Sequence, residues 1–273
     1  MLNLELSSDY IYRYLLKLLS RFGIQLLLLA NCTLLLLSVT PIFGMEQIVL
    51  RDNFSDYMDS SGYLHIVGEV ENLGSIDTRY VKITATCYDS NDTVVDTDFT
   101  YTRLDVVPAN RRAPFEITID PAVAGKVRTF RLTGTFHNAS QSLPRTLVLL
   151  SNSSYMDGGY LNIVGEVKNN GTQISHYAKV VITCYDNSGK VVAVDYAFTD
   201  PHDLVVGARA PFKGIVSAQR SPLVTRFELQ VESNEAIMVP EFSAISLVII
   251  STCFLALLLT MKRTTRGYCQ KTV

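Results

Sequence analysis

The sequence predicts an all-β body of two tandem antiparallel β-sandwiches, held between two apolar segments. Three observations lead to this prediction. First, the motif YLHIVGEVENLG begins at Tyr63 and returns as YLNIVGEVKNNG at Tyr160, 97 positions later. Second, residues around the motif alternate between apolar and polar, which is the period of a β-strand. Third, one apolar run stands near each end of the chain, with basic residues on the side away from the repeats.

Later landmarks keep the same offset of 97 positions. They are Tyr80 and Tyr177, Cys87-Tyr88-Asp89 and Cys184-Tyr185-Asp186, Ala113-Pro114-Phe115 and Ala210-Pro211-Phe212, and Phe130 and Phe227. An offset that persists over about 70 positions indicates two copies of one folding unit. We therefore expect a first repeat over 45–137, a linker over 138–147 and a second repeat over 148–234 in this chain of 273 residues.

Segment 1–44 joins a basic flank to an apolar run. Arg13, Lys17 and Arg21 come first, and the run covers about 22–40. This order is typical of a secretory signal peptide or of an uncleaved signal anchor, and both readings stay open. A buried core helix would normally have a polar face, which this run lacks. The segment therefore predicts export.

A second apolar run covers 242–261, and a basic cytoplasmic tail is expected over 262–273. Twenty helical residues span about 30 Å, which is the thickness of the hydrocarbon core of a bilayer. The basic residues lie outside both runs, so the positive-inside rule places both termini in the cytoplasm and residues 45–238 outside the cell. The second run is expected to be a transmembrane helix.

Charge and cysteine content narrow the function classes. Within residues 45–238, 17 Lys and Arg stand against 23 Asp and Glu. An acidic surface without a basic cluster argues against nucleic acid as a partner. Each repeat has a single cysteine, Cys87 or Cys184, so no disulfide can form within a repeat. Both lie on apolar strand faces, and we interpret them as small core residues rather than reactive thiols.

Alternation assigns the faces of the first two strong strands. The positions expected in the core are Leu64, Ile66, Gly68, Val70, Val81, Ile83, Ala85 and Cys87, and the positions 97 later; His65, Val67, Glu69 and Glu71 are expected on the outer face. Further strands are expected over 94–101, 115–119 and 129–136, with partners starting at Val191, Phe212 and Arg226. Pro114 and Pro211 are expected at the mouth of a strand, where a missing N–H is tolerated.

These residues carry a resemblance. A strand ending in Gly-Glu-Val-x-Asn, a strand ending in Tyr-Asp and a late Pro-Phe together resemble the FxLYD domain, an immunoglobulin-like module of prokaryotic envelope proteins. The resemblance covers about 50–137 and 148–232, with Cys where the family has Leu. It implies two tandem immunoglobulin-like antiparallel β-sandwiches. The family has no settled activity, so the resemblance implies no site residues.

The segment over 235–241 is expected to be a stalk. Pro240-Glu241-Phe242, the apolar run and the basic pair Lys262-Arg263 resemble the PEF-type archaeal sorting signal. In that system an archaeosortase removes the span and a lipid holds the mature chain, so the resemblance implies an archaeal envelope protein with a sorting peptidase as a partner. The alternative is chance, because proline and interfacial aromatics are common at the ends of spans.

The exported part contains five Asn-x-Ser/Thr sequons, at Asn53, Asn91, Asn138, Asn152 and Asn170. They lie in predicted turns, linkers or strand starts, and each is a candidate for N-glycosylation. Turns favour the same residue types for conformational reasons. The sequons therefore leave glycosylation and simple turn formation as alternatives.

No catalytic, cofactor-binding or metal-binding residue is assigned. The histidines lack ligand spacing, and the aspartates near Asp89 and Asp96 are interpreted as solvated turn carboxylates rather than a calcium site. Gly-x-Ser-x-Gly, His-Glu-x-x-His and a glycine-rich phosphate loop do not occur in the sequence. Glu69 and Glu166 share one strand position, which suggests either a sugar-binding or acid role or a simple cross-strand pair.

We therefore predict a non-enzymatic, membrane-anchored cell-surface protein that presents its two repeats for structural or adhesive contacts with other envelope proteins. The alternative is a ligand- or sugar-binding module, or an accessory subunit of a membrane enzyme. A hydrolase is a third hypothesis. Charged residues that converge in a pocket would favour the second or third hypothesis, and featureless surfaces would favour the first.

Overall fold

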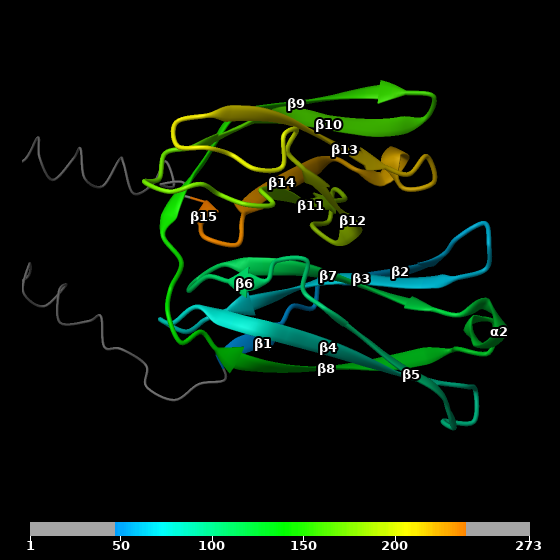
Figure 1. Ribbon diagram of the computed structural model, residues 1–273. Coiled ribbons are helices and arrows are strands. Elements are labelled where there is room, and N and C mark those ends of the chain that lie inside the picture. The colour runs from blue at the N-terminus through cyan, green and yellow to red at the C-terminus, as the bar shows by residue number, and fades with distance from the viewer. Residues whose placement is uncertain (1–46, 239–273) are drawn as a thin grey trace, which may run out of the picture. The chain divides into compact units, whose positions relative to one another are not determined.

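The computed structural model describes residues 47–238, which form mostly β-strands (Figure 1). The strands of the first repeat are β1 (Ile48–Leu50), β2 (Ser55–Met58), β3 (Leu64–Asn72), β4 (Thr78–Tyr88), β5 (Val94–Tyr101), β6 (Val106–Val107), β7 (Arg112–Ile119) and β8 (Thr129–Asn138). Those of the second repeat are β9 (Arg145–Asp157), β10 (Tyr160–Asn169), β11 (Lys179–Tyr185), β12 (Val191–Phe198), β13 (Arg209–Val216), β14 (Arg226–Glu232) and β15 (Ile237–Met238). Two single-turn helices, α2 (Pro121–Ala124) and the 3₁₀ helix η1 (Ser221–Leu223), complete the elements. The predicted all-β body is confirmed.

The predicted anchor runs over about 22–40 and 242–261, the basic flank before the first and the tail over 262–273 lie outside the described residues. Within 47–238, no helix combines the length and the apolar character needed to cross a bilayer.

The first repeat has two antiparallel sheets that share one interior. In one sheet β3 pairs with β7 along one edge and with β1 and β2 along the other. In the other sheet β4 pairs with β8 along one edge and with β5 and β6 along the other. Side chains from both sheets, among them Ile66, Ile83 and Phe115, form one hydrophobic cluster.

The second repeat repeats this plan with one addition. Strands β9, β10 and β13 form one group and β12, β11 and β14 the other, and Ile163, Ile182 and Phe212 belong to the cluster between them. The short β15 joins the groups, because it pairs antiparallel with β14 and parallel with β9. The result is a continuous path of seven strands.

The strand faces agree with the alternation in the sequence. The predicted core positions of the first copy, including Ile66, Ile83 and Cys87, are buried in the cluster of that copy, and Cys184 is buried in the cluster of the second. The strands expected over 94–101 and 129–136 are found as β5 and β8. Period-two reading therefore located the cores correctly.

The glycine of the Gly-Glu-Val motif lies under the phenylalanine of the Pro-Phe motif. Gly68 pairs with Phe115 across β3 and β7, and Gly165 pairs with Phe212 across β10 and β13. A Cβ atom on Gly68 would lie 2.8 Å from the Phe115 ring, and one on Gly165 would lie 2.7 Å from the Phe212 ring. Since the ring fills the space of a side chain, these two shared residue types have a structural role.

The asparagine that ends the motif is a buried hydrogen-bonding node. Asn72 Nδ2 donates to the carbonyl oxygens of Ile76 at 2.8 Å and Val107 at 3.0 Å, and its Oδ1 accepts from Gly74 N–H. Asn169 makes the same three bonds, with Gln173, Leu204 and Gly171. A buried amide needs such partners, so identical bonds in both copies explain why both keep asparagine.

The aspartate of the Tyr-Asp motif organises the next hairpin turn. Asp89 Oδ1 accepts hydrogen bonds from the backbone N–H groups two and four residues later, and Asp186 does the same. The hydrogen bonds to Ser188 and Lys190 lower the pKa of Asp186 against the opposing effect of desolvation. These carboxylates are turn residues, as the sequence indicated.

The positions of two prolines differ from the prediction. Pro114 and Pro211 lie inside β7 and β13 rather than at the mouth of a strand. Each of these strands pairs with a single neighbouring strand, so the missing N–H breaks no ladder bond. The proline carbonyl oxygens accept from backbone N–H groups of the preceding loops, at 2.8 Å from Arg103 and 2.9 Å from Asp200.

The strands of the second repeat extend beyond the expected range of 148–234. Strand β9 begins inside the expected linker, 138–147, and β15 lies inside the expected stalk, 235–241. Leu147 and Ile237 are buried residues at these two ends. They close the interior of the repeat. Alternation did not reveal this role, because the part of β9 inside the expected linker and the whole of β15 are both short.

Candidate functional site

The two repeats touch through the outer faces of one sheet from each. Strand β12 of the second repeat packs against β2, β3 and β7 of the first. A small apolar cluster lies between them, formed by the fully buried Val67, Tyr185 and Val191 with Tyr57 and Val194 packed against it. We call this region the inter-repeat contact. The sequence had placed Val67 on an outer face, and the structure shows that the neighbouring repeat covers it.

Glu69 is the buried acid of the inter-repeat contact, with 1% of its surface exposed. The hydroxyl of Tyr185 donates to Glu69 Oε1 at 2.6 Å, and Asn53 Nδ2 donates to Oε2 at 2.9 Å. Arg112 lies 3.9 Å from the same carboxylate. Burial, reinforced by the Glu69 charge, raises the pKa of Tyr185 well above its ordinary value. Tyr185 therefore remains a hydrogen-bond donor.

A second buried carboxylate joins the repeats at Glu232 on β14. Its oxygens accept from the backbone N–H of Asp105 at 2.9 Å and of Val106 at 3.3 Å, both in the first repeat. Lys179 Nζ lies 2.8 Å from the carboxylate. Desolvation raises the pKa of Glu232, and the Lys179 charge opposes that rise. The loop N–H groups and the lysine together replace the water that Glu232 loses on burial.

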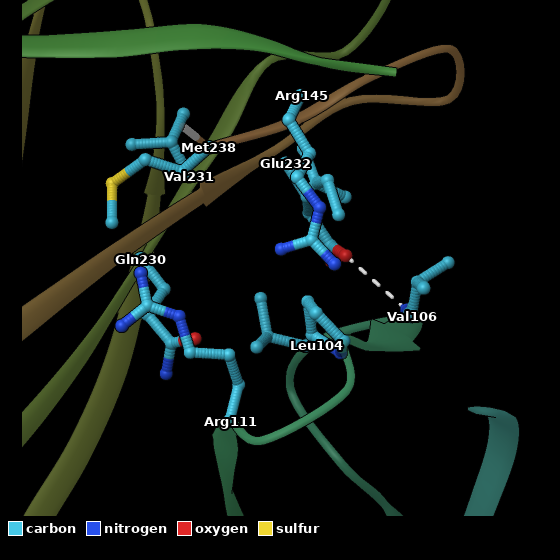
Figure 2. A pocket seen from close by; sticks show the side chains of 10 residues that line it. Leu104, Val106, Arg111, Arg145, Gln230, Val231, Glu232 and Met238 are labelled. Atoms are coloured by element: carbon cyan, nitrogen blue, oxygen red, sulfur yellow. Dashed lines mark hydrogen bonds between the residues drawn. The ribbon is translucent and has the colours of Figure 1, made fainter. Parts of the chain in front are cut away.

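Figure 2 shows this region from close by, with the hydrogen bond from Val106 N–H to Glu232. Leu104 and Arg111 come from the first repeat, and Arg145 and Gln230 come from the second. The space between them is only about 10 Å³. That is close to the space needed by one water molecule, so this cavity cannot hold an organic ligand.

Further polar contacts surround the inter-repeat contact. Val191 N–H donates to Asn53 O, Gln219 Nε2 to Met58 O and Gln230 Nε2 to Arg112 O, each at 2.8 Å. The Arg220 guanidinium lies 4.1 Å from the centre of the Tyr57 ring, within the range of a cation–π interaction. The repeats are therefore joined by specific bonds as well as by the covalent linker.

A charged cluster that sequence reasoning missed lies on the first repeat. His65 Nδ1 is 3.0 Å from Glu116 Oε1, and His65 Nε2 is 3.3 Å from Asp59 Oδ2. Arg103 also bonds Glu116, at 2.8 Å, and the Tyr57 ring stacks on His65. Both ring nitrogens are engaged, so the cluster fixes the imidazole in place. The sequence did not reveal this cluster, because its residues come from three separate segments and the pairing register of their strands cannot be read from the sequence.

The glycosylation candidates fall into two groups. Asn91, Asn138, Asn152 and Asn170 are exposed, and glycosylation there stays a prediction. The amide nitrogen of Asn53 is the atom that a glycan would occupy, and it donates to Glu69 inside the inter-repeat contact. The fold therefore disfavours a glycan at Asn53. The sorting residues Pro240, Glu241 and Phe242 lie outside the described residues.

The cysteines behave as core residues. Cys87 and Cys184 are fully buried and unbonded. Burial raises the pKa of the Cys87 thiol to about 11 and that of Cys184 to about 12. In the described part of the chain, no three side chains among His, Cys, Asp and Glu come together in a way that would bind a metal ion.

Glu166, the counterpart of Glu69, has a different environment. It is partly exposed, and its nearest cationic partner is Arg209 at 3.8 Å. It lines an open groove of about 660 Å³, together with Ser153, Val164 and Lys213. The two glutamates thus share a strand position without forming one site: the first joins the repeats and the second faces a groove.

A second groove, of about 510 Å³, lies beside β4 and β5. Arg79, Tyr80, Tyr101 and Asp105 line it. Tyr80 is 66% exposed and has φ of 52°, a left-handed conformation that is uncommon for an aromatic residue. Tyr177 repeats this conformation in the second copy, with φ of 54°.

Comparisons with known proteins identify no family. No family model matches the chain, and no curated protein matches it either. Among solved structures, an exo-chitosanase of Amycolatopsis orientalis is 10% identical with a TM-score of 0.26, over 70% of this chain and 26% of that one. A red sea bream transglutaminase is 10% identical with a TM-score of 0.24, over 72% of this chain and 32% of that one. The chain thus spans a third or less of these proteins, and we draw nothing from TM-scores this low.

Proposed function

We propose that this chain is a non-enzymatic, membrane-anchored protein of the cell envelope that presents two immunoglobulin-like β-sandwiches for structural or adhesive contacts. The observation that carries the proposal is the inter-repeat contact. Glu69, Tyr185 and Glu232 are buried ionisable groups, and they join one repeat to the other. Because these polar side chains hold the two repeats together, they support a structural role rather than a catalytic one.

The proposed immunoglobulin-like assignment is supported by features within each repeat. Antiparallel sheets enclose one hydrophobic cluster per repeat. The Gly–Phe pairs, the buried Asn72 and Asn169, and the Asp89 and Asp186 turns give a structural reason for most of the motif that resembles the FxLYD domain.

The proposed place in the envelope is supported by the ends of the sequence. Two apolar runs with basic flanks favour export and membrane attachment, and Pro240-Glu241-Phe242 favours processing by an archaeosortase. The intact mass of the chain purified from membranes tests the processing. Loss of the residues after about 240 is expected, and a full-length C-terminus would rule out sorting.

Surface display is tested by epitope tags at two positions of the full chain. Gly125 is exposed with open space around its Cα, so a tag inserted after it should leave the fold intact. We expect an antibody to stain this tag on intact cells. A matched tag after Val273 should stain only after permeabilisation, in cells that block sorting. Staining of the Gly125 tag only in permeabilised cells would contradict the proposal.

A small-ligand or sugar-binding module is the second candidate, favoured by the groove beside Tyr80. Exposed tyrosines next to charged side chains offer both a stacking surface and hydrogen bonds to a sugar. Saturation-transfer NMR with a panel of neutral oligosaccharides tests it. Binding that is lost in Tyr80→Ala and retained in Tyr177→Ala would support this candidate, and no transfer to any oligosaccharide would remove it.

A further inference from the structure

In the inter-repeat contact, the second repeat packs with its β11–β12 face, which we call the inserting face, on the β2–β3–β7 face of the first repeat, which we call the receiving face. The receiving face has a close counterpart on the second repeat itself. Strand register defines the equivalence: Ser55 pairs with Val67 on β3, and Ser153 pairs with Val164 on β10. In the same way Tyr57 pairs with His65, and Tyr155 with Asn162. The receiving residues Ser55, Tyr57, Val67, Glu69 and Arg112 therefore correspond to Ser153, Tyr155, Val164, Glu166 and Arg209, which are the same five residue types.

The inserting face also has a counterpart. Tyr185 and Val191 pair with each other across β11 and β12, and Tyr88 and Val94 make the same pair across β4 and β5. Lys179 corresponds in turn to Lys82. The first repeat therefore displays the tyrosine, valine and lysine with which the second repeat inserts, and has Thr97 in the place of Val194.

These counterpart faces are exposed where the originals are buried. Val191 is fully buried, whereas Val94 is 53% exposed. Val67 is fully buried and Tyr57 is half-buried, whereas their counterparts Val164 and Tyr155 are partly exposed, Tyr155 by 46%. The groove of about 660 Å³ over Val164 and Glu166 lies on the receiving counterpart. Exposed apolar side chains grouped on a sheet face are typical of a surface that binds another protein.

We propose that a second copy of this chain is the partner of these faces. The β4–β5 face of one copy, with Tyr88 and Val94, docks on the β9–β10–β13 face of another copy, with Tyr155, Val164 and Glu166. Tyr88 donates to Glu166 as Tyr185 donates to Glu69. This inference rests on the proposed contact function and names the partner for it.

The two faces differ from each other and lie on different repeats, so the contact is heterologous. A pair of copies still has one free face of each kind, one at each end. Head-to-tail rows of copies follow from this arrangement. The surrounding bonds are not duplicated, because Glu232 and Gln230 correspond to Thr135 and Thr133. The contact between copies should therefore be weaker than the contact within one chain.

Two single variants of the full-length chain test the proposal in detergent. Val94→Arg places a charge on the inserting face and Val164→Arg on the receiving face, and both sites are at least partly exposed. Sedimentation velocity should show wild-type species that grow past dimers as the concentration rises. Each variant alone should associate at least about tenfold more weakly, since a desolvated charge costs more than the factor of ten in affinity that corresponds to about 1.4 kcal/mol.

An equimolar mixture of the two variants is the decisive sample. Val94→Arg keeps an intact receiving face and Val164→Arg an intact inserting face, so the mixture should form dimers and stop there. Val205→Arg, at an exposed valine in the loop between β12 and β13 and outside the strands of both faces, is the matched control and should associate like the wild type.

Several results would overturn the proposal. They are a wild-type chain that stays monomeric at every concentration, single variants that associate like the wild type, and a mixture that stays monomeric. The tag-staining experiment reads surface display separately, so its outcome is distinguishable from any of these.

Discussion

The hydroxyl of Tyr185 lies 2.6 Å from Oε1 of Glu69, although the two residues are 116 positions apart and belong to different copies of the repeat. Burial keeps the phenol protonated, so it can only donate to the carboxylate. A bond from a neutral hydroxyl to a buried charge is stronger than one between neutral groups. The orientation of one repeat on the other thus depends on a pair of side chains that both copies possess.

Removal of this hydroxyl should destabilise the protein. Tyr185→Phe leaves one oxygen of the buried Glu69 carboxylate without its donor, which should cost about 1.5–3 kcal/mol in the free energy of unfolding. Urea unfolding of the full chain measures the loss. The matched control is Tyr88→Phe, at the equivalent and partly exposed position, which should change stability by less than about 0.5 kcal/mol at low protein concentration. Equal effects of the two substitutions would contradict the assigned role.

A methyl group at the glycine of the motif should also destabilise the fold. In Gly68→Ala the new Cβ would lie within 3 Å of the Phe115 ring and of Phe54 Cβ, so both residues must shift, at a cost of about 1–3 kcal/mol. Gly125→Ala is the control, because its Cβ meets open space and its φ is −64°. That change should stabilise the chain by about 0.4–1 kcal/mol. Thermal unfolding of both variants measures the contrast.

The core thiols should resist alkylation. Since pKa values of about 11 and about 12 leave little thiolate at pH 8, iodoacetamide should not modify Cys87 or Cys184 in the native chain. Peptide mapping before and after unfolding in urea checks this. Rapid modification of either cysteine in the native chain would mean that the hydrophobic core of its repeat opens to solvent.

His176 and Asp203 form a pair with a defined pH dependence. His176 Nδ1 lies 3.0 Å from Asp203 Oδ2. The hydrogen bond between them raises the pKa of His176 above 6.5 and lowers the pKa of Asp203 below 3.8. The histidine contribution to stability is complete below pH 6.5 and is lost as the pH rises through its folded pKa. The aspartate contribution is present above pH 3.8 and is lost as the pH falls through its folded pKa. Asp203→Asn should return the NMR-detected pKa of His176 toward 6.5.

Glycan occupancy should spare one sequon. Because Asn53 Nδ2 donates to buried Glu69, we expect no glycan at Asn53 in the folded chain. Glycopeptide mass spectrometry of the chain from its native membrane checks this site against Asn91, whose exposed turn could carry a glycan. A glycan at Asn53 with the repeats still packed together would show that the inter-repeat contact is assembled differently.

Much of the fold could be read from the sequence because burial within a sheet follows period two. The alternation placed Ile83 and Cys87 in the core, and both are fully buried. The hairpin residue Asp89 was correctly read as a turn carboxylate for a similar reason, since its hydrogen bonds are local. Signals of this kind depend on a few neighbouring residues.

The contact between the repeats could not be read in this way. Val67 and Val164 stand in the same sequence context, yet Val67 is fully buried and Val164 lines an open groove. The alternation distinguishes the inner face of a sheet from its outer face. It does not show whether solvent or another repeat covers the outer face. The short β15 was missed for a different reason, because two residues carry no measurable period.

Strand β15 determines how mechanical tension would enter the body. It is the last described strand, and it is held by parallel pairing to the beginning of β9 and by one antiparallel pair to β14. A pull applied beyond Met238 would load these few backbone bonds before it reached the seven-residue ladder between β14 and β11. Under a force applied from the C-terminal side, β15 should therefore detach first, while the remaining strands of the second repeat stay folded.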